Sequence, residues 1–73
     1  MPQISIAAAR VNAKLTQKEL ASKLGVSNTS VVAWENGQRE IPLRHLVTLA
    51  ELSGLSINDI FVPMKSEKTV SSD

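Results

Sequence analysis

Residues 16–37, TQKELASKLGVSNTSVVAWENG, most narrowly constrain what this chain can fold into. Thr16 and Glu19 have the T-x-x-E spacing of a capping box, which predicts that a helix begins just after Thr16. Gly25 follows a helical apolar pattern, and glycine at this place favours the left-handed conformation that ends a helix. Ser27 is a good N-cap for a second helix. The segment therefore predicts two short helices joined by a tight turn.

The second of these helices has two different faces. Val31 and Trp34 are three residues apart, so they share a face that we expect to point into the core. The remaining face carries small or polar side chains, namely Asn28, Thr29, Val32, Ala33 and Asn36. A helix with small polar groups at its N-terminal end suits the DNA major groove. Taken alone, this face fits an ordinary solvated surface equally well.

Residues inside this segment and on both sides of it form a longer pattern. They are Arg10, Leu15-Thr16-Gln17, Glu19-Leu20-Ala21, Leu24-Gly25-Val26-Ser27, Val31, Trp34-Glu35-Asn36-Gly37, Pro42, Leu46, Leu49-Ala50 and Leu55. With these residues the chain resembles the phage repressor/Cro (XRE-type) helix-turn-helix family over roughly residues 4–61. The resemblance implies an all-α fold, a compact five-helix domain of the lambda-repressor type that binds double-stranded DNA.

The rest of the chain supplies the other predicted helices. Residues 4–13 contain three consecutive alanines, which favour helix. Residues 43–53 place an apolar stripe on one helix face. Ser56 and Asp59 have the spacing of a weaker capping box and predict a short fifth helix.

Length and composition exclude several classes of protein. The 73 residues allow one domain, which we expect to span residues 1–63, with a polar and disordered tail at 64–73. The chain has no cysteine, and His45 is its only histidine, so we expect no metal, no cofactor and no catalytic activity. Without a membrane-length apolar run or a recognisable signal peptide, the cytoplasm is the expected location.

The net charge of the chain is only +1, so DNA binding would depend on where charges lie. We expect phosphate contacts from Thr16, Gln17, Ser27, Asn36, Arg39 and Arg44. Gln17 would begin a helix, whose N-terminus favours phosphate, and the resemblance implies the same role. The resemblance also implies that both arginines lie along the phosphate backbone and that Arg10 pairs with Glu35.

Base reading is expected from Asn28, Thr29, Val32 and Ala33. Asparagine can pair with adenine through two hydrogen bonds, and the methyl groups of the other three suit thymine. Because this face has no arginine or glutamine to read guanine, we expect contacts that favour A·T pairs.

A single domain of this size binds DNA weakly, so we expect a homodimer, at least on DNA, with half-sites about 34 Å apart. The candidate dimer surface is Leu52, Leu55, Ile57, Phe61 and Val62, although these residues could equally complete the core. The sequence thus predicts a transcriptional regulator of phage or bacterial type, with repression as the expected role. An antitoxin-like or other protein-interaction module, with a partner bound through the tail, is the alternative.

Overall fold

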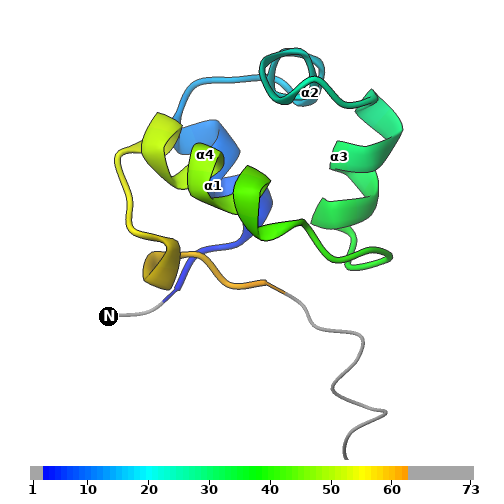
Figure 1. Cartoon of the computed structure of the whole chain (residues 1–73). Coiled ribbons are helices and arrows are strands. Elements are labelled where there is room, and N and C mark those ends of the chain that lie inside the picture. The colour runs from blue at the N-terminus through cyan, green and yellow to red at the C-terminus, as the bar shows by residue number, and fades with distance from the viewer. Residues whose placement is uncertain (1–2, 63–73) are drawn as a thin grey trace, which may run out of the picture.

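The structure, a computed structural model, describes residues 3–62 and consists of short helices (Figure 1). Their bounds are α1 Ile6–Asn12, α2 Gln17–Leu24, α3 Asn28–Glu35 and α4 Leu43–Ser53, followed by the 3₁₀ helix η1, Ile57–Asp59. The all-α prediction is confirmed within this range, except that the fifth helix is a single 3₁₀ turn. The expected tail at 64–73 lies outside the described residues.

The two ends of the described chain pair with each other. This pairing explains why the first and the fifth helix are shorter than predicted. The Ile4 N–H donates to the Asp59 carbonyl at 2.9 Å, and the Phe61 N–H donates to the Ile4 carbonyl at 2.7 Å. Ile4 is therefore held in a bridge with Ile60, and α1 begins at Ile6 rather than at residue 4. The same bridge keeps Ile60 extended, so η1 cannot continue into an α-helix.

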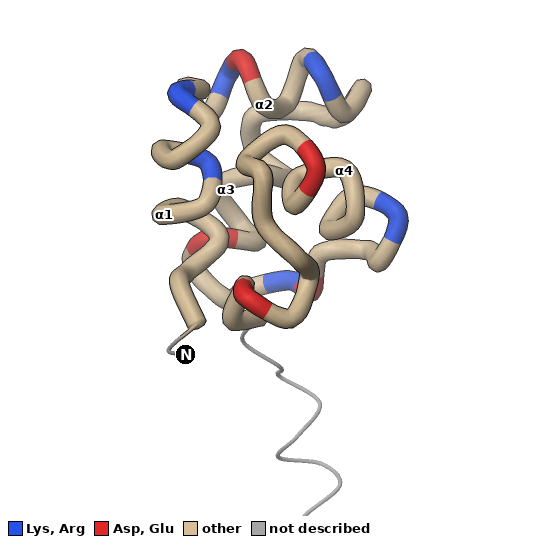
Figure 2. The backbone as a smooth tube through the Cα atoms, turned by 90° about the vertical axis from the view of Figure 1, so that its left-hand side faces the viewer, with Lys and Arg blue, Asp and Glu red and all other residues tan. Residues whose placement is uncertain are grey.

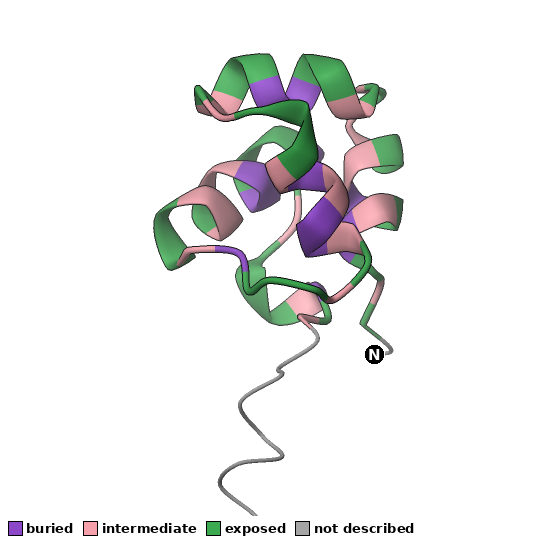
Figure 3. Ribbon diagram, turned by 90° about the vertical axis from the view of Figure 1, so that its right-hand side faces the viewer, coloured by how far each residue is buried: buried purple, intermediate pink, exposed green. Residues whose placement is uncertain are grey.

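A single hydrophobic core lies between the helices. α1 packs against α4, and α2 packs against α3. Buried residues come from every α-helix and from the segments beside them, and Figure 3 marks their places along the ribbon in purple. The cluster consists of Ile6, Ala9, Leu20, Ala21, Val31, Trp34, Ile41, Leu49, Ala50 and Ile60.

Glycine ends two of the helices, and Gly25 does so at the predicted place. Gly25 and Gly54 have φ angles of 71° and 72°, in the left-handed region that residues with a Cβ rarely adopt. A Cβ built at either position would meet nothing within 4 Å. The requirement for glycine there is therefore conformational and not steric.

Candidate nucleic-acid interface

The α2–turn–α3 unit forms through local hydrogen bonds that the sequence predicts. The Glu19 N–H donates to Thr16 Oγ1 at 3.0 Å, and the Thr16 N–H donates to Glu19 Oε1 at 2.8 Å, which completes the capping box. After the left-handed turn at Gly25, Ser27 Oγ accepts from the Ser30 N–H and caps α3. The start of α3 is therefore fixed by residues within a few positions of the end of α2.

α3 points its apolar side inward as predicted. Val31 and Trp34 are 0% and 4% exposed, whereas Asn28 and Thr29 are exposed at the N-terminal end of the same helix. Val32 lies between the two faces and is half-buried. The exposed first turn of α3 faces the viewer in Figure 3. Two polar side chains are thus left free for an external partner.

Base reading by Ala33 is not supported by the structure, because only 6% of this residue is exposed. It lies five positions after Asn28, about 140° around the helix, which is near the edge of the exposed face. The segment after α3 turns back toward the end of the helix. The N–H groups of Gln38 and Arg39 donate to the Ala33 carbonyl at 2.9 and 3.4 Å, respectively. With so little of the residue exposed, its methyl group has almost no surface left for contact with a thymine.

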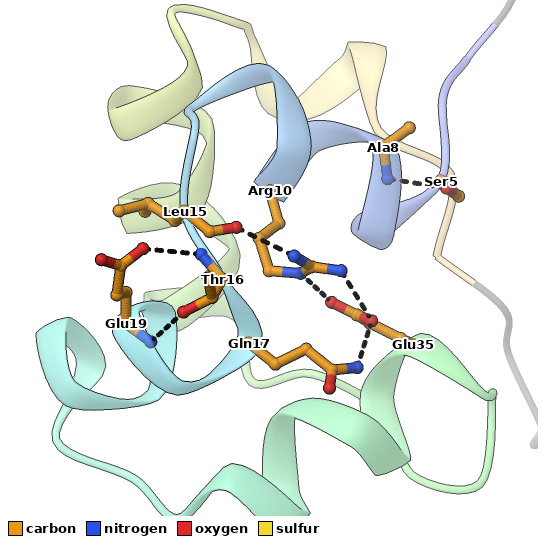
Figure 4. Close-up of polar contacts among 8 residues, drawn as sticks. All are labelled: Ser5, Ala8, Arg10, Leu15, Thr16, Gln17, Glu19 and Glu35. Carbon is orange, nitrogen blue, oxygen red and sulfur yellow. Dashed lines mark hydrogen bonds and ion pairs between the residues drawn. The ribbon is translucent and has the colours of Figure 1, made fainter.

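The predicted pair of Arg10 and Glu35 is part of a larger network (Figure 4). Arg10 Nε lies 2.6 Å from Glu35 Oε2, and the two side chains are only 15% and 7% exposed. Arg10 Nη2 also donates to Glu35 Oε1 at 3.4 Å, and Nη1 donates to the Leu15 carbonyl at 2.9 Å. The pair connects α1 to the end of α3 and to the loop before α2.

Gln17 joins the same network, which the sequence did not indicate. Its Nε2 donates to Glu35 Oε1 at 2.9 Å, so the Glu35 carboxylate receives hydrogen bonds from both Arg10 and Gln17 (Figure 4). The amide of Gln17 has a second N–H, and its side chain is only partly buried. The carboxylate therefore holds this side chain in place at the start of α2.

The other candidate phosphate contacts lie on several elements and share only their exposure. Ser27, Asn36, Arg39 and Arg44 are all exposed, as is Thr16, although the Thr16 hydroxyl already serves as the acceptor of the α2 cap. Arg39 Nη1 lies 3.5 Å from Ser30 Oγ, which places this guanidinium beside the first turns of α3. Ser30 is a neighbour of the site that the sequence analysis missed. Figure 2 shows that basic residues are spread over the molecule and do not form one dense patch.

Comparison with known families gives a match to the family described as Helix-turn-helix over residues 6–60, three-quarters of the chain. The chain belongs to this helix-turn-helix family. Its second and third helices, α2 and α3, are the pair after which the family is named.

A relative found by direct sequence comparison points to the same class. The chain is 42% identical over 48 residues to the uncharacterized HTH-type transcriptional regulator MJ0272 of Methanocaldococcus jannaschii. That match covers 66% of this chain and 73% of the relative. No solved structure matches the chain. Family and relative together support a DNA-binding regulator of transcription, and they confirm the prediction that the chain is not an enzyme.

The helix-turn-helix domain also buries part of the expected dimer surface. Leu55 and Val62 are partly buried and pack against the core, which the sequence left open as an alternative. Leu52, Ile57 and Phe61 remain exposed, and Phe61 is the most open of them at 53%.

His45 is half-buried on α4 and its ring centroid lies 5.5 Å from that of Trp34, which places it against the core. Within residues 3–62, no cluster of three potential metal ligands and no pocket is present. None of the helices in this range is long and apolar enough to span a membrane.

Proposed function

We propose that this protein binds a specific double-stranded DNA site as a homodimer, places α3 in the major groove, and represses transcription. One observation carries the proposal: α3 buries Val31 and Trp34 and leaves Asn28 and Thr29 exposed at its N-terminal end. In helix-turn-helix proteins, the N-terminal residues of the second helix contact the edges of the bases. Because the proposed target is DNA, the cytoplasm is the expected place of action.

Base reading is proposed for Asn28, Thr29 and Val32. Asn28 can donate to and accept from adenine, while the methyl groups of Thr29 and Val32 can contact thymine. Ala33 is left out because it is buried. With no arginine or glutamine on this face, we expect the directly read positions to favour A·T pairs.

Register on the DNA would come from groups on either side of α3. Thr16 and Gln17 lie at the N-terminus of α2, where backbone N–H groups favour an anion. Ser27 and Asn36 cap the two ends of α3, Arg39 follows this helix and Arg44 lies on α4, and all four are exposed. Contacts to phosphate set position and orientation, and they carry no sequence information themselves. This division of roles can be tested residue by residue.

The dimer would form through the exposed part of the apolar surface, Leu52, Ile57 and Phe61. Two protomers related by a two-fold axis would meet two half-sites about 34 Å apart. A palindromic site is the expected consequence, because protein symmetry is mirrored in the DNA.

Selection of bound duplexes from a random DNA pool, with the full 73-residue chain, tests the proposal. We expect a palindromic consensus with A·T pairs at the positions facing α3. Asn28→Ala should lower discrimination at one position by about 1–3 kcal/mol without changing the urea midpoint of unfolding. Asn58→Ala is the matched control, since Asn58 is also exposed but lies on η1.

Salt dependence distinguishes the proposal from a protein-interaction module. Arg39 and Arg44 are the charged groups among the proposed phosphate contacts, so log K should fall with log salt at a slope of about −2 per protomer. A flat salt response, together with no enriched sequence, would contradict DNA binding and favour the interaction module. If Arg39→Ala abolished sequence preference while Asn28→Ala left it intact, the division between reading and positioning residues would be wrong.

A further inference from the structure

The backbone at Lys14, between α1 and α2, is unusual. Lys14 has a φ of 63° and is the only residue other than glycine with a positive φ within residues 3–62. Gly25, Gly37 and Gly54 occupy the other positive-φ positions of this range, with φ between 71° and 77°. A Cβ makes this conformation less favourable than it is for glycine. The chain thus carries a lysine at a place where glycine would have the lower energy.

The fold requires the conformation but not the lysine side chain. The Lys14 N–H donates to the Val11 carbonyl at 2.8 Å, and the Leu15 N–H donates to the Arg10 carbonyl at 3.2 Å, which ends α1. The turn brings the Leu15 carbonyl back to Arg10 Nη1 at 2.9 Å (Figure 4). Glycine could make all of these backbone contacts. The Lys14 side chain is exposed, and within residues 3–62 its ammonium has no acidic partner.

Lys14 lies two residues before Thr16, the N-cap of α2, and three before Gln17. Gln17 is held by Glu35, so this end of α2 has a fixed position relative to α3. Lys14 directly follows the C-terminal end of α1, where the helix dipole favours a cation, and precedes the N-terminus of α2, where it favours an anion such as phosphate. An unpaired ammonium, a strained backbone and a fixed position beside the proposed interface all favour a role outside the fold.

We infer that Lys14 contacts a DNA phosphate next to the one bound at the start of α2. The inference rests on the proposed function and adds a contact to it. The ammonium group supplies a charge that a glycine could not, and neutralising one phosphate releases counterions from the DNA. The contact is independent of base sequence, so it should strengthen binding to specific and random duplexes alike.

Salt titrations of the full chain on a duplex of random sequence test this inference. Lys14→Gln removes the charge and keeps the side-chain size, and Lys23→Gln is the matched control at the other end of α2, where Lys23 is also exposed. We expect Lys14→Gln to reduce the slope of log K against log salt by about 0.9 per protomer. If the variant and the unaltered protein bind equally at about 1 M salt, this difference makes the variant bind about 4-fold more weakly per protomer at about 200 mM. At about 50 mM the variant binds about 15-fold more weakly per protomer. Lys23→Gln should bind like the unaltered protein.

A second variant separates a DNA contact from a structural role. Lys14→Gly should keep or raise the urea midpoint of unfolding, because glycine adopts this conformation freely, while DNA binding falls as in Lys14→Gln. An unchanged slope in Lys14→Gln, an equal loss in Lys23→Gln, or a lower urea midpoint in Lys14→Gly would overturn the inference. If the unaltered protein binds duplex with a salt-dependent affinity and selects a palindrome, these results would reject the Lys14 contact alone. Absence of any duplex binding by the unaltered protein would reject both proposals.

Discussion

Replacing Arg10 with methionine should strongly destabilise the domain. The side chain of Glu35 is 7% exposed, and without Arg10 its charge would keep a hydrogen bond only from Gln17. The Leu15 carbonyl would also lose its hydrogen bond from Arg10. Breaking a buried ion pair by removing one partner costs about 3–5 kcal/mol. Because Arg10 retains some contact with solvent, we expect a value at the lower end, about 3 kcal/mol.

That loss is large for a chain of this size. Domains have a free energy of unfolding of about 0.05–0.15 kcal/mol per residue, or about 4–11 kcal/mol for 73 residues. For a small protein, the free energy of unfolding falls by about 1 kcal/mol or slightly more per molar urea. The urea midpoint of Arg10→Met should therefore fall by about 2–3 M. Unfolding can be followed by fluorescence, since Trp34 is the only tryptophan and is buried in the core.

Two further variants test whether the lost stability comes from the uncompensated charge of Glu35. Arg44→Met removes an exposed arginine and should change stability by no more than about 0.5 kcal/mol. The double variant Arg10→Met, Glu35→Met removes both charges and should recover most of the stability, because no uncompensated charge remains. A cost below about 1 kcal/mol for Arg10→Met, as exposed pairs show, would refute the reasoning. A double variant as unstable as the single one would assign the cost to lost packing.

Three other substitutions test the elements that build the site, each by its effect on the urea midpoint. Thr16→Ala removes the capping hydroxyl of α2 and should cost about 1 kcal/mol; no loss would mean that the capping box adds nothing to stability. Gly25→Ala has room for its Cβ, but the φ of 71° at this position should lower the free energy of unfolding by about 1–2 kcal/mol. Gly25→Asn should lower it less, because asparagine adopts this conformation more readily, and equal effects of the two variants would contradict this. Val31→Ala leaves a cavity in a fully buried position and should cost about 2–3 kcal/mol, whereas a cost near zero would show that the core collapses around it.

Local chemistry made the central unit predictable from sequence. The capping box of Thr16 and Glu19 and the left-handed turn at Gly25 each involve residues within a few positions of one another, so their patterns are visible in the chain. Helical spacing likewise separates the buried Val31 and Trp34 from the exposed first turn of α3. The partnership of Arg10 and Glu35 was expected only from the family resemblance, because the two residues lie far apart in sequence.

Tertiary structure decided the rest, because those features depend on segments distant in sequence. Leu55 and Val62 pack against the core, an outcome that the sequence alone left open. Gln17 is held by Glu35, a contact between different helices.

The same holds at the end of the domain, where Ile60 pairs with Ile4 and limits η1 to one turn. The chain by itself therefore determined where α2 and α3 begin and end and which side of α3 faces the core. Only packing between distant segments determined that Glu35 holds Gln17 and that Leu55 and Val62 pack against the core, because these contacts are between residues far apart in the sequence.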